Sequence, residues 1–160
     1  MSLGGGGGGG GRQQLQQLSE AIEAVEEEIA ELRAEIDSVQ AEQREIDEAI
    51  EAIETLETGS TVQVPLGGGA YVRAEIEDID EIIVTLGGGY AAEQPQEAAI
   101  DALENRKDAL DDRIDEIQDE ITDLESESAE LEEEAQQLQS QLQQQQMQQL
   151  QQMQGQDEDE

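Results

Sequence analysis

The sequence predicts a mainly α-helical protein, a long antiparallel two-helix coiled coil with two β-hairpins at its base. Three observations predict this fold. Apolar residues recur about every 3.5 residues in two long segments, which is the pattern of a coiled coil. The block between these segments alternates apolar and polar residues around two Gly-Gly-Gly runs, as β-hairpins do. The 160 residues include no Phe, no Trp and only two Tyr, so the large side chains that usually fill a compact core are missing.

The first heptad segment predicts a coiled-coil helix over residues 12–58. Its apolar a and d positions are Leu15, Leu18, Ile22, Val25, Ile29, Leu32, Ile36, Val39, Ile46, Ile50 and Ile53. Residues 1–11 precede this helix and are mostly glycine, so they are predicted to form a disordered Gly-rich tail. Gly59 follows the helix and is its expected C-terminal cap.

Residues 59–94 predict two β-hairpins in series. The glycine runs at 67–69 and 87–89 are turn signals between alternating segments, and Pro65 indicates an edge strand or a bulge. A single hairpin is marginally stable and leaves its edges unpaired. We therefore expect the hairpins to join strands of other subunits in a multi-subunit β-barrel or sandwich. The residues expected at this oligomerisation surface are Val62, Val64, Leu66, Val72, Ile76, Ile82 and Val84.

The second heptad segment predicts a coiled-coil helix over residues 95–153, entered at Pro95. Its a and d positions are Ile100, Leu103, Lys107, Leu110, Ile114, Ile117, Ile121, Leu124, Ser128, Leu131, Ala135, Leu138 and Leu142. Beyond Leu142 the pattern gives way to glutamine, and residues 154–160 are predicted to be an acidic disordered tail. If this helix folds back on the first, both apolar stripes are covered in an arm about 70 Å long. The hairpins then lie at its base and both chain termini at its distal tip.

Three polar residues interrupt the heptad a positions: Gln43, Lys107 and Ser128. They are either tolerated imperfections or devices that fix the pairing register at some cost in stability, and the pattern leaves both readings open. Matching the helix ends places Gln43 opposite residues 111–113, and not against Lys107.

The chain is strongly acidic, with 42 Asp and Glu against 7 Lys and Arg and a formal net charge of −35. This charge repels phosphate backbones and anionic lipid, so no nucleic acid and no membrane is expected as a partner. Part of the acidity is a solvated helix exterior. Together with a single lysine and no cysteine, it also favours a halophilic organism, because salt screens carboxylate repulsion. Without a long apolar run or a signal peptide, the expected location is the cytoplasm.

No enzymatic chemistry is predicted. Without His or Cys, the nucleophile-and-base arrangements of hydrolases cannot form. The glycine runs lack the Lys-Ser/Thr pair of a phosphate-binding loop and lead into strands. Acidic pairs such as Asp111 and Asp112 lack the spacing of a calcium loop. We therefore expect a protein that is not an enzyme and that uses no cofactor and no metal.

The two hairpin segments resemble those of archaeal prefoldin α subunits. The first is Thr-Gly-Ser-Thr-Val-Gln-Val-Pro-Leu-Gly-Gly-Gly-Ala-Tyr-Val-Arg-Ala-Glu-Ile at residues 58–76, and the second is Asp-Glu-Ile-Ile-Val-Thr-Leu-Gly-Gly-Gly-Tyr-Ala-Ala-Glu at residues 80–93. Two hairpins rather than one resemble the α class rather than the β class. The resemblance implies an ATP-independent chaperone in which two α and four β subunits form a hexamer. Its arms would hold unfolded polypeptides at their tips and pass them to a group II chaperonin.

The predicted client-binding residues lie near the distal tip. They are Leu15, Leu18, Leu138, Leu142, Met147, Leu150 and Met153. The four leucines occupy a or d positions, so packing within the coiled coil is the alternative interpretation for them. Flexible thioethers outside the heptad register suit contacts with many partners.

For the whole protein, one alternative function is a structural coiled-coil scaffold or spacer without client binding. Another is an RNA-presenting arm of a synthetase, which the negative charge disfavours.

Overall fold

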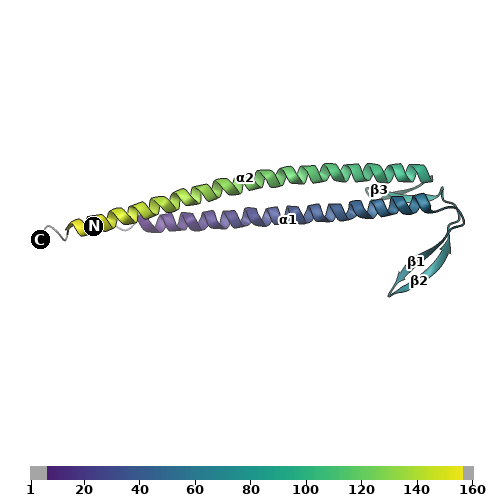
Figure 1. Ribbon diagram of the computed structural model, residues 1–160, viewed down its shortest axis with the longest axis horizontal. Helices are drawn as coiled ribbons and strands as arrows, with labels where there is room; N and C mark the ends of the chain where they lie inside the picture. Colours follow the sequence, from purple (N-terminus) through teal and green to yellow (C-terminus); the bar gives the residue numbers. More distant parts are fainter. Residues whose placement is uncertain (1–6, 157–160) are drawn as a thin grey trace. The chain divides into compact units, whose positions relative to one another are not determined.

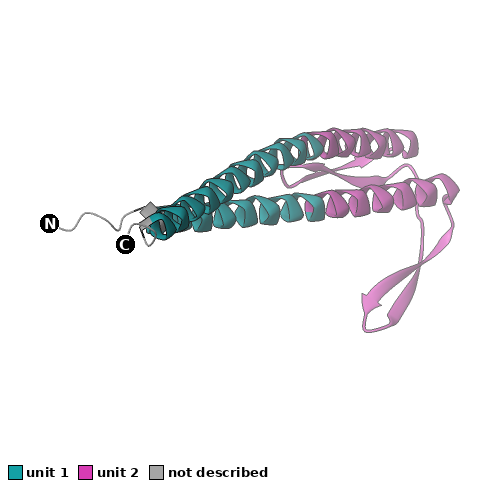
Figure 2. Ribbon diagram, turned by 60° about the vertical axis from the view of Figure 1, so that its left-hand side comes forward, with its two compact units in different colours: residues 1–34, 117–160 teal, residues 35–116 magenta. Residues whose placement is uncertain are grey.

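The computed structural model describes residues 7–156, which form two long helices and two β-hairpins (Figure 1). The elements in order are α1 (Gly7–Thr55), β1 (Thr61–Gly67), β2 (Ala70–Glu75), β3 (Ile82–Gly87), β4 (Tyr90–Gln94) and α2 (Gln96–Gln156). The predicted coiled coil with two hairpins is thereby confirmed, and the hairpins close no barrel among the described residues of this chain. The chain divides into two compact units, residues 1–34 with 117–160 and residues 35–116 (Figure 2).

The first unit pairs the beginning of α1 with the end of α2 (Figure 2). Its buried apolar residues are Val25, Ile29, Ile117 and Ile121, which all occupy predicted a or d positions. Ile117 is fully buried, with 0% of its surface exposed. Arg33 and Glu125 join the two helices beside this seam at 2.9 Å. The heptad pattern therefore covers the apolar stripes within the chain, as a coiled coil requires.

Helix α1 begins at Gly7, five residues before its predicted start. The disordered tail predicted for residues 1–11 is therefore wrong for 7–11, and residues 1–6 lie outside the described residues. Extending an existing helix is far easier than nucleating one, so even glycine can be added at its end. Gly11 also lies against Leu142, where an added Cβ would be 2.5 Å from that residue's Cδ2. At its other end α2 continues to Gln156. The disordered tail predicted for residues 154–160 is therefore wrong for 154–156, and residues 157–160 lie outside the described part of the chain.

The two hairpins of the second unit are built alike. β1 pairs with β2 and β3 with β4, both antiparallel, and each pair shifts register just before its turn, at Pro65/Gly67 and Thr85/Gly87. The turn glycines Gly68 and Gly69 have φ values of 61° and 82°, and those of the second hairpin have the same values. Positive φ at both central residues is the condition for a type I′ turn, which glycine meets without strain. The repeat seen in the sequence is thus a repeat of backbone conformation.

The connections around the hairpins join the two helices of this unit. Gly59 lies beyond the end of α1 in a turn, and its N–H donates to the Ile76 carbonyl at 2.8 Å, so its predicted role as helix cap is wrong. The Gln96 side chain instead donates to the Ile53 carbonyl in the last turn of α1 at 2.6 Å. This bond satisfies a carbonyl that the helix itself leaves without a partner.

Candidate assembly and binding surfaces

The first hairpin exposes large apolar side chains. Val64, Leu66, Tyr71 and Val72 are 40–68% exposed, whereas Val62 and Ile76 are half-buried. Apart from Ile76, which follows β2, these residues lie on a two-stranded sheet that has no further strand beside it in the described part of the chain. Exposed apolar surface next to unpaired backbone groups is the property of a sheet that another chain can extend.

The second hairpin uses its two faces differently from the prediction. Val84, expected at the oligomerisation surface, is 7% exposed, whereas its neighbour Ile83 is 70% exposed. The end of β3 runs beside the first turns of α2, and Leu86 and Ala102 both line the groove of about 450 Å³ between them. Val84 is thus mostly covered by its own chain, and its place at the oligomerisation surface stays a prediction. Ile82 is half-buried.

Sequence reasoning missed four exposed residues of the hairpins. They are Tyr71, Ile83, Leu86 and Tyr90. A signal for Ile83 was present, because Ile82, Ile83 and Val84 are consecutive and therefore place apolar side chains on both faces of β3. A strand that is apolar on both faces needs cover from two sides, and the chain's own helix supplies one of them.

A polar layer crosses the seam of the second unit. The Gln43 amide donates to Asp111 Oδ1 at 2.6 Å and to the Lys107 carbonyl at 3.3 Å. The prediction that Gln43 lies opposite residue 111 holds, and the expected separation from Lys107 is wrong, because one amide reaches both residues. The Lys107 ammonium bonds Asp47 Oδ1 at 2.7 Å. Both polar a-position side chains of this layer therefore have partners on the facing helix.

The Asp47 hydrogen bond raises the pKa of Lys107 above its ordinary value of 10.5, aided by the carboxylates of Asp47, Asp111 and Asp108 and opposed by partial desolvation. A pKa raised on folding means that charged Lys107 stabilises the fold fully below pH 10.5, and that this contribution is lost as the pH rises through the folded-state pKa.

We expect the thermal midpoint of the wild-type chain to fall as the pH rises above 10.5 and through the raised pKa of Lys107. Lys107→Arg should resist this fall, because arginine keeps its charge over this pH range. Melting curves followed by circular dichroism at constant salt would measure the difference. Parallel curves for the two proteins would contradict the role assigned to the Lys107–Asp47 pair.

Further ion pairs of this unit involve Arg106 with Glu42 and Arg113 with Glu35. The Arg113 pair measures 2.7 Å. All of these side chains are about two-fifths exposed or more, except Glu42 at 36%, so each pair contributes little energy on its own. Their common effect is to place the few cations of an acidic chain between its two helices.

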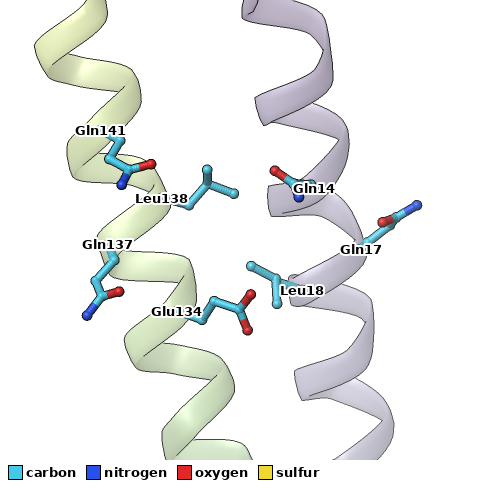
Figure 3. Close-up of a pocket in the computed structure, with 7 residues that line it drawn as sticks. All are labelled: Gln14, Gln17, Leu18, Glu134, Gln137, Leu138 and Gln141. Carbon is cyan, nitrogen blue, oxygen red and sulfur yellow. The ribbon is translucent and has the colours of Figure 1, made fainter.

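The predicted tip residues fall into two groups in the first unit. Leu15, Leu18, Leu138 and Leu142 are half-buried between α1 and α2. Leu18 and Leu138 line a groove of about 340 Å³ and point toward the space between the helices (Figure 3). The seam is thus less closed here than at Ile29 and Ile121, which are buried.

The second group of tip residues lies on the glutamine-rich end of α2. Met147, Leu150 and Met153 are 67%, 61% and 71% exposed. The structure therefore brings the four leucines together at the seam and leaves these three side chains on the surface.

No helix among residues 7–156 is long and apolar enough to cross a membrane.

These features define a class of protein: a coiled-coil protein whose β-hairpins have open edges and exposed apolar side chains. Residues 25–141, more than half of the chain, match the family model described as "Prefoldin subunit". The chain belongs to the prefoldin family.

Curated relatives named prefoldin subunit alpha support the α-class resemblance. Those of Halorubrum lacusprofundi and Haloarcula marismortui are 74% and 67% identical over 49 residues, which is 31% of this chain and 32% of each relative. That of Methanosarcina mazei is 48% identical over 44 residues, 28% of this chain and 31% of the relative. The aligned stretch thus spans about a third of the length of these relatives. The predicted resemblance to a halophilic archaeal prefoldin α subunit is confirmed.

A solved structure shares the fold over most of the chain. It is a chain from the cryo-EM structure of filamentous PFD from Methanocaldococcus jannaschii, with a TM-score of 0.64 and 28% sequence identity. The match covers 72% of this chain and 98% of that one.

Proposed function

We propose that this chain is the α-class subunit of an ATP-independent chaperone that binds unfolded polypeptides at its coiled-coil tips. It assembles with prefoldin β subunits, two α with four β, works in the cytoplasm and transfers its clients to a group II chaperonin. No catalytic step is required, because holding a client and releasing it to a partner change no covalent bond.

The observation that carries this proposal is the pair of open-edged hairpins with exposed apolar residues. Leu66, Ile83 and Tyr90 are each more than half exposed, which is costly for a chain that acts alone in water. A structural scaffold or spacer, the alternative function, has no use for such strands. Family membership supports the chaperone reading.

Mixing this chain with a prefoldin β subunit in molar salt is expected to give a hexamer that contains two copies of this chain. Size-exclusion chromatography with light scattering would measure the mass. Ile83→Glu should prevent assembly, because it places a charge where an apolar side chain meets a partner strand. Gln63→Glu makes an equal change in charge at an exposed polar position of β1. It is expected to impair assembly less than Ile83→Glu does. An elongated monomer or dimer indifferent to the β subunit would favour the scaffold.

Removing residues 1–18 together with 139–160 is expected to abolish suppression of client aggregation, because the truncation takes away six of the seven predicted tip residues and strips the seventh, Leu138, of its facing helix. Light scattering of an aggregating unfolded protein would measure suppression, and chromatography would verify that the hexamer remains. Full suppression by an intact truncated hexamer would refute the assignment of client binding to the tips.

A further inference from the structure

Charge is distributed unevenly along this acidic chain. All 42 acidic residues lie between Glu20 and Glu134 or in the last four residues. Residues 135–156 contain no charged side chain, and Arg12 is the single charged side chain in residues 1–19. The structure brings residues 9–19 and 135–155 together in one compact unit, where Gly11 lies against Leu142. We call residues 9–19 and 135–155 the neutral end.

Three apolar side chains of the neutral end are exposed on α2. Met147, Leu150 and Met153 are spaced by three residues, so they form one stripe along α2. Met147 follows the seam residue Leu142 by five positions, which turns it about 140° around the helix. Leu150 and Met153 follow Leu142 by eight and eleven positions, about 80° and 20° around the helix, so the stripe winds back toward the seam side. All three side chains are 61–71% exposed.

Glutamine surrounds this stripe and supplies hydrogen bonds that carry no charge. One open groove of about 500 Å³ on α2 is lined by Glu133, Gln136, Gln137, Ser140, Gln141 and Gln144. Each glutamine amide offers two N–H donors and a carbonyl acceptor. Such groups can bond the backbone N–H and C=O of an extended chain whatever its side chains are. Hydrogen bonds between neutral groups and contacts with methionine are not screened by salt, unlike ion pairs.

Building on the proposed holding function, we propose that unfolded polypeptides of net negative charge bind at the neutral end, where the arm repels them least, with an affinity that salt does not weaken. An acidic client is repelled by the carboxylate-covered helices between Glu20 and Glu134, and repulsion between like charges excludes partners. Residues 135–156 present it no carboxylate side chain, although Glu133 and Glu134 precede this stretch and residues 157–160 are again acidic. The hairpins are also poor in carboxylates, but in the proposed assembly their strands are covered by other subunits. A basic client, by contrast, would be held along the acidic helices, and salt would release it.

The test uses the assembled complex and two fluorescent unfolded peptides of equal length and apolar content, one rich in Asp and Glu and one rich in Lys and Arg. Fluorescence anisotropy would give Kd over the salt range in which circular dichroism shows the complex folded. For the acidic peptide we expect Kd to stay constant or fall as salt rises. For the basic peptide we expect Kd to rise.

A triple variant, Gln144→Glu, Gln148→Glu and Gln151→Glu, places carboxylates beside the stripe. At the lowest salt that keeps the complex folded, it should weaken binding of the acidic peptide by about tenfold, since each pair of like charges at contact distance costs about 1 kcal/mol in water. Alanine at the same three positions is the matched control for lost amides, and should weaken both peptides alike.

Equal binding of the two peptides at every salt concentration, or an unaffected glutamate variant, would overturn the binding of acidic clients at the neutral end while leaving the holding function intact. Binding of neither peptide by the folded complex would overturn the holding function itself, and this inference with it.

Discussion

Ile117→Ala is expected to lower the free energy of unfolding by about 2–5 kcal/mol, the range for removing a buried isoleucine side chain. Ile117 is fully buried at the seam of α1 and α2. The chain has no Phe or Trp to compensate, and a typical protein is stable by only about 5–15 kcal/mol. Denaturant unfolding followed by helical circular dichroism, in molar salt, would measure the change.

The matched control is Ile83→Ala, the same substitution at a residue that is 70% exposed. In the isolated chain it should change stability by about 0.5 kcal/mol or less, as surface substitutions do. In the proposed assembly Ile83→Ala is expected to cost more stability than in the isolated chain, because Ile83 would then be covered by a partner strand. Similar losses for both variants in the isolated chain would mean that the seam does not carry the stability assigned to it.

Transfer from molar to millimolar salt is expected to unfold the chain partly or to dissociate its assembly. The formal net charge is −35, so the carboxylates of the helices repel one another. Salt screens this repulsion, and the screening length grows from about 3 Å at 1 M to about 30 Å at 0.01 M. Ion pairs such as Arg33–Glu125 and Arg113–Glu35 strengthen as salt falls, but their side chains are 41–63% exposed. Each is worth at most about 1 kcal/mol, so repulsion dominates.

Melting curves in a KCl series would measure this effect, with light scattering to detect dissociation. A variant with Glu26, Glu27 and Glu28 all replaced by Gln, at exposed positions of α1, should need less salt to reach the same midpoint. Replacing KCl by sucrose, which strengthens burial without screening charge, should stabilise less. A melting curve unchanged between molar and millimolar salt would refute the prediction.

The helical seam was predictable from the sequence because it depends on local periodicity. The helix residues Val25, Ile46, Ile114 and Ile121 are buried, and all four occupy a or d positions of the heptads. Even the polar Ser128, 8% exposed, is at an a position. Ala99 is an exception: it lies outside these positions and is fully buried near the start of α2. A repeat of about 3.5 residues fixes which side of a helix faces its partner, wherever the partner lies.

The hairpins were predictable for the same reason, since paired positive-φ glycines such as Gly68 and Gly69 are a local requirement of the turn. The location of the four tip leucines between the two helices also followed from the heptads, whereas the other three tip residues lie beyond the heptad pattern. Their binding of clients remains a proposal that rests on exposure at Met147, Leu150 and Met153.

The sequence by itself determined the elements of this protein, because helix seam, strand alternation and turn chemistry are encoded within a few residues. Only the tertiary structure decided which surfaces remain free. A period of two places Ile83 and Val84 on opposite faces of β3, but the helix that covers one face begins at Gln96. Likewise, Gln43 meets both Lys107 and Asp111 because the facing helix brings them within reach of one amide. Contacts between segments distant in the sequence depend on how the elements pack, which no local pattern specifies.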